Sequence, residues 1–303
     1  MQKINRLNEL TTFVKQSGKI KTVAVACAED SNTLNAIARA TQEGFINPIL
    51  IGNEKLIQNV VFDNKLNIDS FKIINIPDKT QSVEKAVEML KNDHADILMK
   101  GLINTDKFLK TILDKQKGLI LPDTIMSYVC AIDIPAYHKL LFVSDTAVIP
   151  FPSLEQKKTM INYSVAMAKK FGIEKPKVAL IDSSEKVNQN SPCSMDYAIL
   201  CKMAERGQIQ DCIIDGPLDI FLACNPESLA VKGIISPIGG DADILIFPSL
   251  VSCNAFYKAL MLFANGELAG LIQGTIKPVV VMSRSESSLS KYYCIALSCL
   301  MSF

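Results

Sequence analysis

The sequence predicts an α/β fold, in which short strands alternate with helices and form mainly parallel sheets. Runs rich in β-branched residues, such as residues 21–27 and 278–282, are typical of buried strands. Segments long enough to be helices separate these runs almost throughout the chain, and parallel strands require crossovers of that length. The chain has 303 residues, 49% hydrophobic and 21% charged, which is enough for about two such domains.

The expected elements follow one another in a regular alternation. Strands are expected at residues 21–27, 48–51, 71–76, 95–99, 139–145, 177–181, 212–215, 244–247 and 278–282. Helices are expected at residues 33–44, 81–92, 104–115, 153–171, 192–206, 253–264 and 287–300. The helix at 104–115 would carry one apolar face, made of Phe108, Leu109, Ile112 and Leu113.

A proline-rich segment at residues 149–152 is a plausible hinge between domains. It leaves the strand at 139–145 and leads into the longest helix, which Ser153 and Gln156 begin with a capping-box pattern. The last strand and helix, after about Gly274, are free to rejoin the first domain.

Composition excludes several classes of function. A net charge of +1 creates no overall electrostatic field that would attract nucleic acid or an anionic membrane. The first residues lack a signal-peptide core, and no apolar run is long enough to span a bilayer. Nine cysteines without any C-x-x-C pair favour reduced thiols and a cytoplasmic protein. With only His94 and His138, a structural zinc site is not expected.

A possible anion site follows the strand at 95–99. Lys100 and Gly101 end that strand, and Asn104 and Thr105 open the next helix, whose free N–H groups and dipole favour phosphate. The alternative is a simple tight turn with a solvated lysine. The P-loop and dinucleotide-binding glycine patterns are both absent from the sequence, which argues against nucleotide hydrolysis and a standard Rossmann dehydrogenase.

Two further polar pairs stand at strand ends. Ser144 and Asp145 end the strand before the hinge, where the carboxylate is either a base, a group that orients a base, or a cap of the turn. Ser283 and Arg284 follow the last strand, where the guanidinium matches phosphate oxygens and the hydroxyl is a hydrogen-bond donor rather than an acylated nucleophile. The alternative is a helix N-cap at Ser283 or Ser285.

In this context the chain resembles the phosphate acetyl/butyryl transferase family. The matching positions are residues 99–101, 145–147, 154–156, 215–218, 235–248, Asn254, 257–258, 270–274 and 278–284. The resemblance implies two α/β/α domains with a cleft between them, similar to isocitrate and isopropylmalate dehydrogenases. The first domain would comprise residues 1–147 and 271–303, with residues 148–270 inserted as the second. It also implies a homodimer.

The resemblance implies roles for residues in both predicted domains. Catalytic roles are expected for Ser283, Arg284, Asp145 and Glu286. Substrate-binding roles are expected for Lys100, Gly101, Asn104, Thr105, Ser144, Ser236, Gly239, Asn254 and Lys258. No metal and no tightly bound cofactor is expected, because coenzyme A or acyl-CoA, phosphate and acyl phosphate are substrates.

Three departures from the family pattern are visible. Ser290 stands where acetyl-transferring members carry an Asp that deprotonates coenzyme A, which favours the butyryl branch. Either Glu286 or Asp145 is then the base, or the site itself lowers the thiol pKa, which is the interpretation we favour. Ile149 and Cys253 replace an Asn and a Gly of many relatives.

The predicted reaction is reversible: butyryl-CoA and phosphate give butyryl phosphate and coenzyme A. Three alternatives stay open. They are the same reaction on acetyl groups, a decarboxylating dehydrogenase of similar fold, and a catalytically silent acyl-CoA-binding relative. The dehydrogenase is disfavoured because its acidic metal ligands and Arg-rich substrate site are not found in the sequence.

Overall fold

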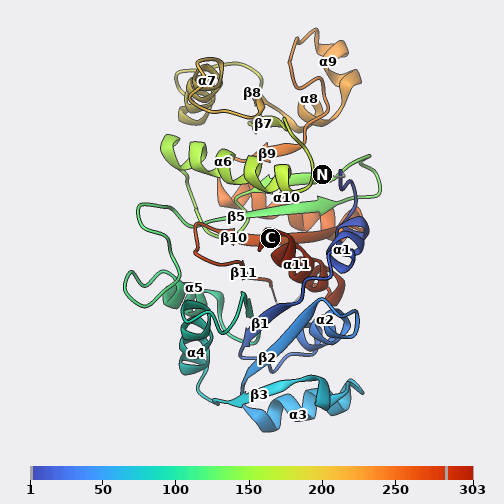
Figure 1. The fold of residues 1–303 in the computed structure, drawn as a ribbon. Helices are drawn as coiled ribbons and strands as arrows, with labels where there is room; N and C mark the ends of the chain where they lie inside the picture. Colours follow the sequence, from blue (N-terminus) through green and yellow to red (C-terminus); the bar gives the residue numbers. More distant parts are fainter. Residues whose placement is uncertain (1–2, 284–285, 303) are drawn as a thin grey trace. The chain divides into compact units, whose positions relative to one another are not determined.

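The computed structural model describes residues 3–283 and 286–302, and the chain divides into two compact units (Figure 1). The terminal unit comprises Leu7–Met126 and Leu268–Phe303, and the central unit comprises Met1–Arg6 and Ser127–Glu267. Both units are α/β, which confirms the predicted fold class. The chain passes from one unit to the other at 6/7, 126/127 and 267/268. The predicted domains, whose boundaries lie at 147/148 and 270/271, stay a prediction.

The strands of the terminal unit lie in the order β3-β2-β1-β4-β11-β10. All neighbouring pairs are parallel except β10 and β11. The strands are β1 (Lys21–Ala26), β2 (Ile46–Gly52), β3 (Lys72–Asn75), β4 (Ile97–Lys100), β10 (Glu267–Gln273) and β11 (Val279–Val280). The chain reverses direction across the sheet between β1 and β4, so the switch point of this α/β arrangement lies at their carboxyl ends.

Helices cover both faces of these strands. They are α1 (Leu7–Gln16), α2 (Ser31–Gln42), α3 (Glu54–Asp63), α4 (Lys79–Lys91), α5 (Thr105–Ile112) and α11 (Ser288–Met301), with a 3-10 turn at Ile68–Ser70. Within this unit α4 and α5 lie on one side of the strands, and α1, α2 and α11 lie on the other (Figure 1). Helix α11 is almost entirely buried, and it packs against α1, α2 and β11.

The central unit has its own strand order, β5-β6-β9-β7-β8. Only β5 and β6 pair antiparallel there. The strands are β5 (Ser127–Asp133), β6 (Leu141–Ser144), β7 (Lys177–Ile181), β8 (Ile213–Leu218) and β9 (Ile244–Ile246). The helices are α6 (Leu154–Lys170), α7 (Pro192–Glu205), α8 (Ile220–Cys224), α9 (Pro226–Lys232) and α10 (Leu250–Phe263). The predicted capping box is confirmed, because Ser153 and Gln156 each bind the other's backbone N–H.

The expected strands and helices are present, with ends that differ by a few residues, but besides the 3-10 turn the expectation omitted six of the α-helices and strands of the described residues. These are α1, α3, α8, α9, β5 and β10. Strands β5 and β10 are buried on both faces along most of their length, so they lack the alternation that marks a half-buried strand. Helix α5 ends at Ile112, earlier than expected, and Leu113 is 42% exposed rather than on the buried face.

Candidate active site

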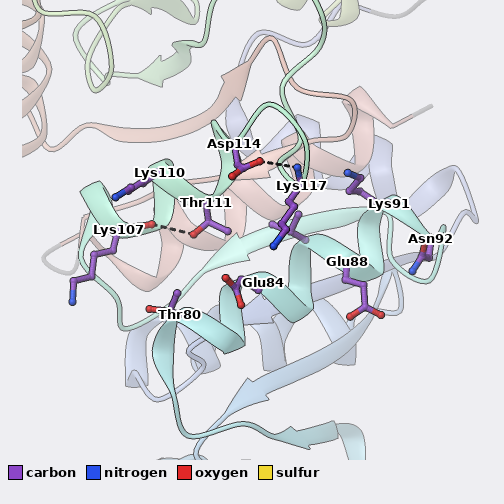
Figure 2. Close-up of a pocket in the computed structure, with 11 residues that line it drawn as sticks. Thr80, Glu84, Glu88, Lys91, Asn92, Lys107, Lys110, Thr111, Asp114 and Lys117 are labelled. Atoms are coloured by element: carbon purple, nitrogen blue, oxygen red, sulfur yellow. Dashed lines mark hydrogen bonds between the residues drawn. The ribbon is translucent and has the colours of Figure 1, made fainter.

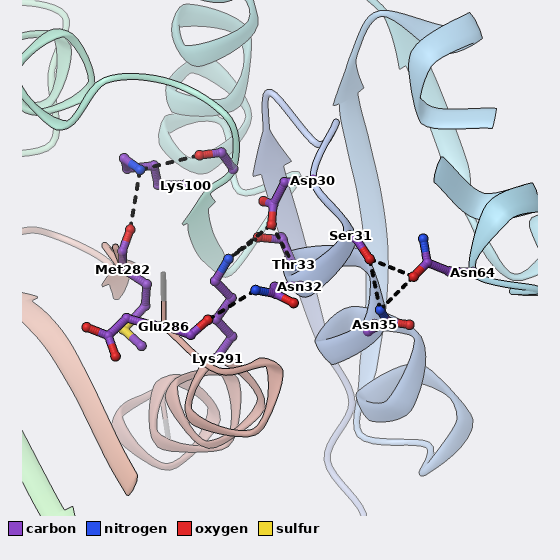
Figure 3. Close-up of polar contacts among 11 residues, drawn as sticks. Asp30, Ser31, Asn32, Thr33, Asn35, Asn64, Lys100, Met282, Glu286 and Lys291 are labelled. Atoms are coloured by element: carbon purple, nitrogen blue, oxygen red, sulfur yellow. Dashed lines mark hydrogen bonds and ion pairs between the residues drawn. The ribbon is translucent and has the colours of Figure 1, made fainter. Parts of the chain in front are cut away.

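The carboxyl ends of β4 and β11 bring two predicted site segments together. Met99 pairs with Val280 in parallel register, so Lys100 and Ser283 leave the sheet at the same edge. The Lys100 ammonium donates to the Met282 carbonyl at 3.3 Å and to the Gly101 carbonyl at 3.3 Å (Figure 3). Lys100 is only 4% exposed, so a buried cation lies directly beside the backbone that leads into Ser283.

Gly101 is required by a close approach of two backbones. A Cβ at this position would lie 2.1 Å from the Cys27 carbonyl oxygen, beyond the end of β1. The Gly101 amide donates to Ala26 at 2.8 Å, and the next amide, of Leu102, donates to Cys27 at 2.6 Å. Gly101 is therefore required by the backbone, but the solvated lysine of the alternative is wrong, because Lys100 is only 4% exposed. The turn lies at the β1/β4 switch point, where ligands of α/β proteins usually bind.

The next helix begins as the anion-site hypothesis requires. Asn104 is the N-cap of α5 in extended backbone geometry, and its side chain makes no capping hydrogen bond. Asn104 is exposed and Thr105 is half-buried, so both are accessible to a ligand at the start of α5. Their substrate-binding role stays a prediction.

The segment after β11 runs from Ser283 to the start of α11. Ser283 is exposed, Glu286 is half-buried, and Arg284 lies outside the described residues. The Glu286 amide donates to the Ser283 carbonyl at 3.3 Å, which closes a turn. The N-cap of α11 is Ser287, whose hydroxyl accepts from the Ser290 amide at 2.9 Å. The alternative in which Ser283 caps this helix is therefore wrong.

Ser290 is buried in the first turn of α11. Its hydroxyl accepts a hydrogen bond from the Leu268 amide of β10 at 3.0 Å. It is 1% exposed, so it supports the packing of α11 against β10. This agrees with the expectation that Ser290 is not the base.

Asp145 of the central unit is buried and held by donors at both carboxylate oxygens. One oxygen accepts from the Ala147 and Val148 amides at 2.7 and 2.9 Å. The other accepts from the Ser127 hydroxyl at 3.0 Å and the Tyr128 amide at 3.1 Å. Burial raises the pKa of Asp145, and these hydrogen bonds oppose the rise. The geometry fits a residue that organises the turn after β6. Ser144 is buried beside it, with its hydroxyl 3.4 Å from that of Ser127.

The other predicted residues of the central unit lie in three places. Asn254, on α10, donates to the Thr146 carbonyl at 2.9 Å and so joins the turn that Asp145 organises. Ser236 and Gly239 form the turn before β9, where the Ser236 carbonyl accepts from the Gly239 amide at 3.1 Å and Gly239 has a φ of +68°. Lys258, also on α10, is exposed.

A surface cavity of about 650 Å³ lies between α4 and α5 (Figure 2). Its lining is Thr80, Glu84, Val87, Glu88, Lys91, Asn92, Lys107, Lys110, Thr111, Asp114 and Lys117. No predicted site residue lines it.

Two expectations concern groups that could bind a metal or act as a nucleophile. Within residues 3–283 and 286–302, no three His, Cys, Asp or Glu side chains come together as a metal site. Burial raises the pKa of the thiol of Cys27 to about 11 and that of Cys294 to about 12, which disfavours thiolate nucleophiles there.

In the described part of the chain, no helix has both the length and the apolar character needed to cross a membrane.

Sequence and structure comparisons define the class to which this fold and this site belong. The family profile described as "Phosphate acetyl/butaryl transferase" matches residues 7–86 and 78–299. The chain therefore belongs to this family of acyltransferases.

Individual relatives match along nearly the whole chain. A "Phosphate butyryltransferase" of Clostridium acetobutylicum is 37% identical over 298 residues, which cover 98% of each chain. A "Phosphate acetyltransferase" of Thermotoga maritima is 40% identical over 281 residues, covering 93% of this chain and 95% of the relative. The crystal structure of a branched-chain phosphotransacylase from Enterococcus faecalis V583 superposes with a TM-score of 0.81 at 28% identity, covering 93% of this chain and 99% of the other.

Proposed function

We propose that this protein is a phosphate butyryltransferase, which transfers a butyryl group reversibly between coenzyme A and inorganic phosphate. The observation that carries the proposal is the buried Lys100 ammonium beside the Ser283 segment, at the carboxyl edge of β4 and β11. Similarity to the clostridial butyryltransferase over 98% of each chain supports the choice of acyl group.

In the direction that forms acyl-CoA, the thiol of coenzyme A first loses its proton. The thiolate then attacks the carbonyl carbon of butyryl phosphate, a carbon–sulfur bond forms, and the carbon–oxygen bond to phosphate breaks. Negative charge develops on the tetrahedral oxygen and on the departing phosphate. Arg284 binds the phosphate or the developing charge, and the exposed Ser283 hydroxyl donates to the thiolate.

The proposed fate of the thiol proton is release to solvent. Ser290 is committed to the β10 backbone, and both oxygens of Asp145 accept hydrogen bonds. Glu286 is half-buried and is the remaining carboxylate of the predicted catalytic set. A buried cation such as Lys100, with Arg284 next in the chain to Ser283, lowers the pKa of a bound thiol by favouring its charged form.

The protein is further proposed to be a cytoplasmic homodimer. Helix α10 supports the dimer, because it exposes the apolar side chains of Val251, Leu262 and Phe263, which are 68, 72 and 81% accessible. Nine cysteines without a disulfide between them support a reducing compartment.

Phosphorolysis of acyl-CoAs from two to six carbons tests the proposed function. The purified protein should release coenzyme A only when phosphate is present, with the highest kcat/KM on butyryl-CoA. A preference for acetyl-CoA would instead identify a phosphate acetyltransferase. Binding of acyl-CoA without turnover of any chain length would identify a catalytically silent relative.

A further inference from the structure

The turn that begins at Ser283 joins β11, a two-residue strand, to α11. Across it, the Glu286 amide donates to the Ser283 carbonyl at 3.3 Å. Groups that transfer an acyl unit must be held within a few tenths of an ångström of the productive geometry. Contacts that other elements make with the two sides of this turn therefore bear on its position.

Two side chains hold backbone carbonyls on either side of the turn. Before it, Lys100 donates to the Met282 carbonyl. After it, the amide of Asn32 donates to the Glu286 carbonyl at 3.3 Å (Figure 3). Asn32 lies in the first turn of α2, 254 residues away in the sequence.

A buried ion pair fixes the first turn of α2 to the first turn of α11. The Lys291 ammonium lies 3.1 Å from Asp30 and 3.2 Å from the Thr33 hydroxyl, and the Lys291 side chain is only 3% exposed. Asp30 is also the N-cap of α2, where it accepts from the Thr33 amide at 3.0 Å. Although burial alone would raise the pKa of Asp30, its hydrogen bonds to Thr33 and the charge of Lys291 lower it.

We propose that Asn32 and Lys291 are positioning residues of the acyl transfer, an inference that rests on the proposed function. The ion pair between Lys291 and Asp30 fixes the position of the α2 N-terminus against α11. From that position, Asn32 donates to the Glu286 carbonyl, which follows the Ser283 turn. A buried ion pair contributes little net stability, and its best attested role is to fix one arrangement of neighbouring elements. Neither residue contacts substrate in this scheme.

The central experiment compares Asn32→Ala with Asn35→Ala. Asn35 lies one turn further along α2 and donates to the Ser31 hydroxyl at 3.2 Å and to Asn64 at 3.0 Å, on the side of α2 away from Glu286 (Figure 3). Both substitutions remove one amide from the same helix, so their effects on Tm should be similar. In Asn32→Ala, kcat should fall about tenfold, and KM should change less than kcat. A tenfold loss is smaller than the roughly hundredfold loss of rate that a 1 Å misplacement of reacting groups causes. In Asn35→Ala kcat should stay within twofold of the wild type.

Hydrogen exchange gives a readout that does not depend on activity. In Asn32→Ala the amides of Glu286 to Ser290 should exchange faster than in the wild type, and in Asn35→Ala they should not. Lys291→Arg should retain most of kcat, because it keeps the charge, whereas Lys291→Met should lower it as Asn32→Ala does.

Equal kcat values and equal exchange rates in the two asparagine variants would overturn the inference. An inactive wild type would refute the proposed function instead. The exchange comparison would then still decide whether Asn32 holds the turn.

Discussion

The two units use the ends of their strands differently. In the terminal unit, β4 and β11 end beside a buried cation, Lys100, and an exposed hydroxyl, Ser283. In the central unit, β6 ends at Asp145, whose carboxylate is buried among four donors. Both places look alike in the sequence, as polar pairs after a buried strand. The difference indicates that a polar side chain at a strand end is available to a ligand where the fold leaves it exposed, as it does Ser283.

The largest expected effect is that of Arg284→Ala. Losing a preorganised charged donor should lower kcat/KM by about a hundredfold to a thousandfold, or roughly 3 to 4 kcal/mol. Arg284→Lys should recover only part of this, because lysine lacks the planar fork that matches phosphate. Steady-state rates on butyryl-CoA and phosphate measure both variants. A folded Ala variant with near-normal turnover would remove Arg284 from the site.

Lys100→Met tests the cation of the terminal unit. The variant loses the bond to the Met282 carbonyl and a positive charge next to the turn, so kcat should fall by tens of fold. The thiol would ionise less readily without this charge. The acidic limb of the pH profile in the coenzyme A-consuming direction should therefore shift to higher pH. An unshifted limb would show that Lys100 does not act on the thiol.

Asp145→Asn tests the contrasting carboxylate. Its amide nitrogen would face backbone donors, so the free energy of unfolding should fall by about 1 to 3 kcal/mol, while kcat changes less than tenfold. Burial raises the folded-state pKa of Asp145, so the folded protein binds the proton more tightly than the unfolded chain. The wild type should therefore gain stability over the variant as the pH falls from the folded pKa toward the unfolded value. Denaturant unfolding at several pH values measures this.

If Asp145 is instead the general base, the same variant would lose about a hundredfold or more in kcat. That result would make the central unit's strand end the reactive one and reverse the comparison.

Glu286→Gln should have the smallest effect. Glu286 is half-buried, and the contact that ties it to α2 uses its backbone carbonyl, which the substitution keeps. Activity within about threefold of the wild type is expected, together with an unchanged pH profile. A loss approaching that of a general base, about a hundredfold, would assign the thiol proton to Glu286.

The sequence predicted most of the fold, because β-branched runs such as residues 21–27 carry their own signal. It missed β5 and β10, whose two-sided burial removes the periodicity. Within the candidate site, the sequence predicted a substrate-binding role for Lys100 and a catalytic role for Ser283. It did not predict that the parallel pairing of β4 and β11 makes these residues neighbours. The contact of Asn32 could not be predicted from the sequence, because its partner is 254 residues away. That partner is a backbone carbonyl, which every residue type carries, so the identity of residue 286 does not indicate the contact.

The close approach at Gly101 has a consequence for mutational tolerance. Gly101 lacks a positive φ, and it excludes side chains because the Cys27 carbonyl oxygen would lie 2.1 Å from any Cβ. Gly239 has a φ of +68°, and a Cβ there would meet only the Lys177 ammonium, at 4.0 Å, within ordinary contact distance. A saturation library should therefore reject every replacement at Gly101. At Gly239 the same library should retain asparagine and aspartate, which tolerate left-handed backbone. These two glycines, each predicted to bind substrate, would thus differ in which substitutions functional variants tolerate.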